Sequence, residues 1–289
     1  MTQESSIITP SGKSAATENF PVGSFLIAPA LRPHVAAYYA WARAIDDIAD
    51  DPELDGQEKL RRLDKMELAL AGAMGRRDPA LAVARNLRQS LLQTDVPFST
   101  ALDLVSAFKQ DVEKSRYGSW DELMDYCDRS AAPVGRFLLH LHGERAAAAF
   151  DASDALCKAL QVINHLQDCK EDYIGLDRVY LPQDWMERHG ANDAMLGAPM
   201  CTENLRKVLD ECLNATRDLM ETAQGLPALL CSRRLAMESA VIINMARELI
   251  AELAGRDPLK AKVRLSKGQY AMAMLKGIWH GLRRDRRKQ

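Results

Sequence analysis

Residues 38–51 read YYAWARAIDDIADD, a stretch with two pairs of aspartates four residues apart: Asp46 with Asp50, and Asp47 with Asp51. Residues four apart lie on the same face of an α-helix. Like charges on one face repel each other, so the helix gains no stability from them, whereas a bound cation turns the repulsion into attraction. The alternative is an acidic helix end dissolved in water, although acids at a helix C-terminus oppose the macrodipole.

The residues around these acids favour a magnesium and phosphate site. Magnesium takes oxygen ligands in octahedral geometry, typically one or two carboxylates, with waters and substrate phosphates at the other positions. Residues 35–45 are apolar and aromatic apart from Arg43, which is typical of a helix whose inner face lines a hydrophobic pocket. Arg43 stands three residues before Asp46 and shares its face, so we expect it to bind a phosphate.

A second stretch, QVINHLQDCKED at residues 161–172, repeats the pattern. Asp168 and Asp172 are four apart, and both share one helical stripe with Asn164 and Gln161. The amide oxygen of Asn164 can join the acids as a metal ligand. Two such helices facing each other would place two carboxylate clusters around one diphosphate. Magnesium ions there would act as Lewis acid and template while the diphosphate leaves.

The rest of the 289-residue sequence is also predicted to be helical. Ala, Leu, Arg, Glu and Met dominate, and apolar residues recur at spacings of three and four. We therefore expect an all-α fold, a single-domain helical bundle around a central apolar cavity. The expected helices cover residues 31–51, 57–74, 79–93, 99–114, 119–142, 153–172, 201–224, 231–254 and 266–284. Residues 133–135, Pro-Val-Gly, interrupt one of them, and either a kink or a broken helix beside the cavity would explain this.

The two ends of the chain differ from this helical body. We expect a flexible leader over residues 1–18, one helical domain over residues 19–284 and a basic tail over residues 285–289. Apolar residues including Trp279 are followed by Arg283 and four more basic residues before the end. A basic amphipathic end of this kind can lie on an anionic membrane, and a solvated, disordered tail is the alternative.

Composition excludes several other classes of protein. The net charge of -2 gives no basic face for nucleic acid. None of the six cysteines forms a CxxC pair, which argues for reduced, mostly buried thiols over disulfides or zinc. There is no signal-peptide pattern and no run of about 18 apolar residues. We expect a cytoplasmic protein, with peripheral contact at the inner membrane face allowed.

Together these blocks resemble the squalene/phytoene synthase family over about residues 19–269. The matching blocks are residues 39–50, 126–135 and 161–182, the last ending in Arg-Val-Tyr-Leu-Pro, with a weaker C-terminal match at residues 263–266. The resemblance implies an isoprenoid synthase helical bundle of the trans-isoprenyl-diphosphate synthase type. It also implies ionisation of an isoprenoid diphosphate assisted by Mg²⁺, with several ions bridging the diphosphate.

The resemblance also assigns roles to individual residues. Metal-binding positions fall on Asp46, Asp50, Asn164, Asp168 and Asp172, with Asp47 adjacent. Diphosphate-binding positions fall on Arg43 and Arg264, and pocket positions on Phe20, Tyr39, Tyr126 and Gln161. Tyr39 or Tyr126 would orient a water or stabilise a carbocation through its ring face, with ordinary core packing as the alternative.

Two features select a branch of the family. Residues 18–24, ENFPVGS, are similar to the hydroxysqualene-forming enzymes of bacterial hopanoid pathways, and Gln167 stands where many members carry Arg. This implies a lyase that ionises presqualene diphosphate and captures the rearranged cation with water. NADPH is not expected, and functional coupling to a presqualene diphosphate synthase is. The alternatives are condensation of two prenyl diphosphates to presqualene diphosphate, squalene or phytoene, and a helical lipid-binding scaffold without chemistry.

Overall fold

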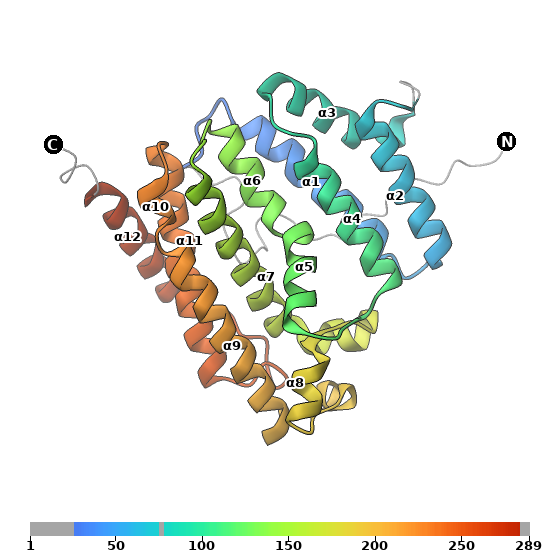
Figure 1. Cartoon of the computed structure of the whole chain (residues 1–289), viewed down its shortest axis with the longest axis vertical. Helices are drawn as coiled ribbons and strands as arrows, with labels where there is room; N and C mark the ends of the chain where they lie inside the picture. The colour runs from blue at the N-terminus through green and yellow to red at the C-terminus, as the bar shows by residue number, and fades with distance from the viewer. Residues whose placement is uncertain (1–25, 75–77, 284–289) are drawn as a thin grey trace. The chain divides into compact units, whose positions relative to one another are not determined.

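The computed structural model describes residues 26–74 and 78–283, with side chains described up to residue 279. The predicted leader, Phe20, the block at residues 18–24 and the basic tail lie outside the described residues. The described part is almost entirely helical (Figure 1), with twelve α-helices, two short 3-10 helices and two short strands. This confirms the predicted all-α class. None of the described helices combines the length and the apolar character that crossing a membrane requires.

The chain packs as two compact units, divided between Lys114 and Ser115. The first unit contains α1 (Arg32–Asp50), α2 (Gly56–Ala71), the 3-10 helix η1 (Pro79–Leu81), α3 (Ala82–Thr94) and α4 (Ser99–Glu113). The second contains β1 (Arg116–Tyr117), α5 (Trp120–Ser130), α6 (Ala132–Leu141), α7 (Ala147–Leu176), β2 (Val179–Pro182), α8 (Gln183–Arg188), the 3-10 helix η2 (Asp193–Gly197), α9 (Glu203–Ala223), α10 (Leu226–Leu229), α11 (Arg233–Gly255) and α12 (Lys267–Arg283).

Within the first unit, α1 packs against α2, α3 and α4. Trp41, Ile45 and Ile48 form its fully buried face. Trp41 donates its indole N–H to the carbonyl of Ala101 at 3.3 Å, which ties α1 to the first turn of α4. The helix ends as predicted, because Asp51 takes extended backbone angles before Pro52. Because Trp41, Ile45 and Ile48 are buried in the core, the opposite side of α1, which carries the aspartates, faces away from the core.

Within the second unit, α7 is the longest helix and packs against α5, α6, α9 and α11. It begins and ends beyond the predicted 153–172 range, and it stops where Asp177 takes a left-handed backbone conformation. The chain then forms β2, which pairs in parallel with β1. Neither strand was predicted, because each is too short to show the alternation that identifies a strand.

The predicted single helix over residues 119–142 is wrong. The structure divides it into α5 and α6 at Ala131, whose backbone leaves the helical region. Pro133, in the first turn of α6, has no N–H to continue the hydrogen-bond ladder of α5 and crowds the preceding turn. The structure therefore shows a broken helix, where the sequence also allowed a kink.

Candidate active site

The first acidic row consists of Asp46, Asp47 and Asp50 on α1. All three side chains lie on the partly exposed side of the helix, opposite the buried Trp41 face. Arg43 lies one turn earlier and contacts two of them, with N–O distances of 2.5 Å to Asp46 and 2.6 Å to Asp47. The predicted sharing of one helix face by Arg43 and Asp46 is confirmed.

Asp51 does not belong to this row, although its spacing from Asp47 suggested that it did. It is buried, and its side chain accepts a hydrogen bond from the backbone N–H of Glu53 at 2.9 Å. Its role is to cap the turn that follows α1. Spacing alone could not separate this capping aspartate from its neighbours.

The second acidic row consists of Gln161, Asn164, Asp168 and Asp172 on α7. All four side chains are half-buried, while Val162, Ile163 and Leu166 beside them are fully buried in the core. The structure therefore confirms that these four residues form one polar stripe along the helix.

A segment near the C-terminus, residues 257–264, is bound to α7 beside this row. The fully buried Gln167 donates its side-chain N–H to the carbonyl of Val263 at 2.5 Å. Lys170 donates to the carbonyl of Leu259 at 3.2 Å.

 Leu259 and Val263 are themselves buried, so both ends of the segment are anchored in the second unit. These contacts hold the segment along the helix face that carries Asp168.

Lys262 lies in this segment and forms an ion pair with Asp168. The sequence carries Gln167 where many family members have Arg, and the resemblance implies a diphosphate-binding cation at Arg264. In the structure Arg264 is exposed, and Lys262 brings the positive charge to the second acidic row. The only signal for Lys262 in the sequence is its place among several basic residues just before the weak C-terminal block.

Four aromatic rings meet in the second unit, and one of them, His165, is carried by α7. Tyr117, Tyr126 and Tyr180 lie with ring centroids 5.2 to 5.7 Å apart, and His165 stacks on Tyr180 at 3.6 Å. All four side chains are buried. Tyr126 is therefore part of a buried aromatic cluster, whereas Tyr39 is half-buried on α1 in the first unit.

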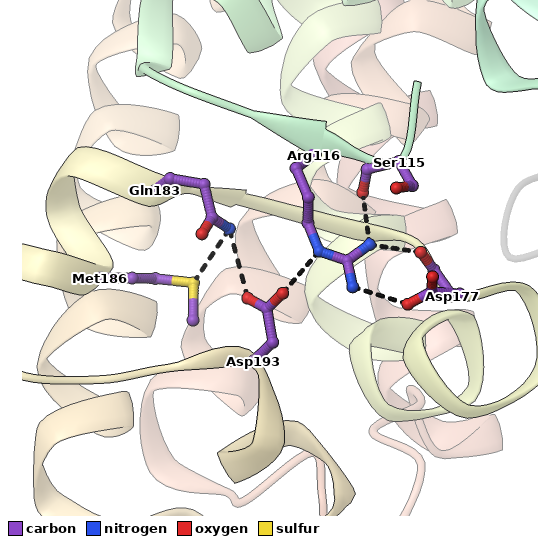
Figure 2. A network of polar contacts seen from close by, with 6 residues as sticks. All are labelled: Ser115, Arg116, Asp177, Gln183, Met186 and Asp193. Atoms are coloured by element: carbon purple, nitrogen blue, oxygen red, sulfur yellow. Dashed lines mark hydrogen bonds and ion pairs between the residues drawn. The ribbon is translucent and has the colours of Figure 1, made fainter. Parts of the chain in front are cut away.

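A charged network fixes the end of α7 beyond Asp172. Figure 2 shows Arg116 between Asp177, just after α7, and Asp193 in η2. Its guanidinium lies 2.6 Å from the Asp177 carboxylate and 2.5 Å from the Asp193 carboxylate. Gln183 donates to the other oxygen of Asp193 at 3.4 Å. The network ties β1, the end of α7 and η2 together, so the second acidic row stands on a braced helix.

Within the described residues, no three His, Cys, Asp or Glu side chains are gathered as a preformed metal centre. Magnesium does not need such a centre, because it is commonly held by one or two carboxylates together with waters and substrate phosphates. The two rows have the oxygen donors for that kind of binding. In each row, a positively charged side chain already contacts a carboxylate.

The fold and the two rows define a helical protein with carboxylates along one face of α1 and one face of α7, and comparison with known proteins gives its family. Residues 14–269 match the model of the squalene/phytoene synthase family. The chain belongs to this family.

Individual proteins similar to this chain show which members of the family it resembles. The hydroxysqualene synthase of Rhodopseudomonas palustris is 43% identical over 91% of this chain and 88% of its own length. The hydroxysqualene synthase of Zymomonas mobilis is 41% identical over 90% of this chain and 86% of its own length. Among solved structures, the squalene synthase HpnC of Alicyclobacillus acidocaldarius superposes with a TM-score of 0.70 at 29% identity, covering 82% of this chain and 88% of that one.

Proposed function

We propose that this chain is a hydroxysqualene synthase, which converts presqualene diphosphate and water to hydroxysqualene and diphosphate. The observation that carries the proposal is the identity of 41% and 43% to two hydroxysqualene synthases over nine-tenths of the chain. The reaction is that of a carbon–oxygen lyase, because a C–O bond to the diphosphate breaks without condensation of two substrates. Its substrate would come from a presqualene diphosphate synthase.

Magnesium is the ion that the two acidic rows would hold. Asp46 and Asp50 would bind it on α1, and Asn164, Asp168 and Asp172 on α7. In each row, the carboxylate or amide oxygens lie on one partly exposed face of their own helix, and such oxygens suit a hard cation. When bound, magnesium would supply Lewis-acid stabilisation of the departing diphosphate.

The protein's own residues would bind and orient the substrate. Arg43 and Lys262 each contact a carboxylate of an acidic row, so both can turn to a diphosphate oxygen when the carboxylate binds a cation instead. Arg264, exposed two residues after Lys262, is a further candidate for the same role. The buried tyrosine cluster would face the hydrocarbon part, where π faces stabilise a carbocation and stray water is excluded.

Condensation of two prenyl diphosphates is the second candidate function. It is favoured by the similarity to a solved squalene synthase. A squalene synthase of this family ends its reaction with hydride, whereas a hydroxysqualene synthase ends it with water. The identity to the two hydroxysqualene synthases favours water, so NADPH is not expected to be needed.

The test is to incubate the purified full chain with presqualene diphosphate and Mg²⁺ in the absence of NADPH. Release of diphosphate together with hydroxysqualene is the expected result. Activity only on farnesyl or geranylgeranyl diphosphate would instead assign the chain to the condensing enzymes. Removal of Mg²⁺ by a chelator is expected to stop diphosphate release.

Asp50→Asn and Asp168→Asn test the two rows separately. Each is expected to slow diphosphate release by roughly 100-fold, because an amide binds magnesium more weakly than a carboxylate. Glu171→Gln is the matched control, since Glu171 is an exposed acid of α7 outside the row. Release at the unmodified rate in both Asn variants would remove the metal assignment.

Peripheral contact with a membrane is part of the proposal, because substrate and product are lipids. On α12, Met272, Leu275 and Trp279 are exposed at spacings of three and four residues, so they share one helix face. An apolar helix face of this kind can lie at the interface of an anionic bilayer.

A further inference from the structure

The environment of His165 differs from that of its neighbours in the second acidic row. It follows Asn164 in α7 but points into the core, where only 7% of its surface is exposed. Its ring stacks on Tyr180 with an interplanar angle of 13°, and Tyr126 lies 6.2 Å away. The two tyrosines come from α5 and β2, so two elements besides its own helix α7 contribute rings next to the imidazole.

The Nε2 atom of His165 is buried and has no hydrogen-bond partner among the described residues. A buried nitrogen without a partner costs roughly 1–3 kcal/mol. Other histidines show the usual solution: His34 bonds Ser90 at 2.8 Å and His189 bonds Glu211 at 2.7 Å. A water molecule would satisfy Nε2 in either tautomer, because water can both donate and accept a hydrogen bond.

We propose that Nε2 of His165 binds the water molecule that captures the final carbocation. This inference rests on the proposed function, because only a hydroxysqualene synthase needs such a water. The buried rings of Tyr126 and Tyr180 make the surroundings of this water apolar, so it would be a single held molecule and not part of bulk solvent. Their π faces also favour a cation close to it.

The capture step balances without a further reagent. A lone pair of the water oxygen forms the new C–O bond to the cationic carbon, and one O–H bond of the water breaks. The proton passes to the diphosphate released in the first step. The sum is one diphosphate ester and one water in, with one alcohol and one protonated diphosphate out. The hydrogen bond to Nε2 holds the water and directs its lone pair at the cation.

His165→Leu removes the nitrogen and keeps an apolar side chain, while His165→Gln keeps a polar group that can bind water. With presqualene diphosphate and Mg²⁺, we expect His165→Leu to keep releasing diphosphate while the share of hydroxysqualene among the products falls at least about tenfold. Hydrocarbons formed by proton loss would replace it. His165→Gln is expected to restore part of the alcohol.

His142→Leu is the matched control, because His142 Nε2 also lacks a partner among the described residues but no ring contact surrounds it. An unchanged share of hydroxysqualene in His165→Leu would overturn the proposal. So would an equal loss of release and alcohol in both His165 variants, which indicates a structural role.

A second measurement does not depend on folded variants or on turnover. In the unmodified chain carrying ¹⁵N-labelled histidine, the Nε2 signal of His165 is expected to show a hydrogen bond to an exchangeable water. A signal typical of a nitrogen without any hydrogen bond would overturn the proposal. If the unmodified chain makes no hydroxysqualene at all, the proposed function fails, and this NMR result separates that failure from the absence of a bound water.

Discussion

Lys262 and Asp168 form a cation–carboxylate pair at the point where the second acidic row meets the 257–264 segment. Both side chains are about one-third exposed, at 34% and 31%, so the pair itself adds little to stability. Its value would lie in placing an ammonium group within reach of a bound phosphate.

Lys262→Met is therefore expected to weaken binding of inorganic diphosphate in the presence of Mg²⁺ about tenfold, which corresponds to about 1.4 kcal/mol. Isothermal titration calorimetry would measure it. Lys260→Met is the control, since Lys260 is exposed in the same segment. If the two variants bind diphosphate equally well, Lys262 does not contact it.

Because His165 is buried, we also expect the free energy of unfolding to decrease at acidic pH. Its pKa is about 3 in the folded chain, against an ordinary value of 6.5, because burial and then Arg178 disfavour the charged ring. Between these pH values the unfolded chain binds more protons than the folded chain, so stability falls as pH drops from 6.5 toward 3. The contribution approaches about 1.4 kcal/mol per pH unit.

Urea unfolding at pH 7, 6 and 5 would measure this effect. His165→Gln is expected to lose less stability than the unmodified chain over that range, because glutamine does not titrate. Parallel pH profiles for the two proteins would show that His165 is not buried in its neutral form.

The residues that sequence analysis identified are those whose relation is local. Asn164, Asp168 and Asp172 share a stripe because the helix repeat fixes it. Lys262 was missed because its contact depends on how Gln167 bonds Val263, 96 residues further along the chain. The capping role of Asp51 could not be predicted, because the hydrogen bond that it accepts from Glu53 depends on the turn after α1.

At the scale of elements, the helical character of each segment was predictable, but the point at which a helix breaks was not. The break at Ala131 needs more than Pro133, because proline is tolerated in the first turn of a helix and also at a kink. Packing decides it: α6 must approach α7 closely enough for Gly135 to lie against Ser153 and Cys157. The pairing of β1 with β2 likewise joins residues 116 and 179, which no local pattern connects.

Gly135→Ala is expected to destabilise the protein by about 1–3 kcal/mol. The added Cβ would overlap the Ser153 hydroxyl and lie 2.8 Å from the Cys157 sulfur, so α6 would have to move away from α7. Denaturant midpoints would report the change.

Gly175→Ala provides the matched control in the last turns of α7. A Cβ at Gly175 meets no atom within 4 Å, and alanine favours the helix over glycine by about 0.5–1 kcal/mol. This variant is expected to be as stable as the unmodified chain or more so. A similar loss in both variants would mean that close packing at Gly135 is not the cause.

At the scale of the whole molecule, the net charge and the exposed apolar surface lead to different expectations about membrane binding. A net charge of -2 gives no general attraction to an anionic bilayer. Any membrane contact must therefore come from a local surface. The exposed face of α12 supplies one, since Met272, Leu275 and Trp279 are 52%, 63% and 55% exposed.

We expect the full chain to co-sediment with vesicles that contain phosphatidylserine. The double variant Leu275→Glu with Trp279→Glu is expected to reduce the bound fraction at least tenfold. The reason is that it removes roughly the transfer free energy of two apolar side chains. Leu92→Glu is the control, because Leu92 is a comparably exposed leucine on α3 in the first unit. Equal binding by the double variant and the control would show that α12 is not the contact. Binding to purely neutral vesicles with the same strength would assign the contact to apolar burial alone, without the basic residues that follow Trp279 in the sequence.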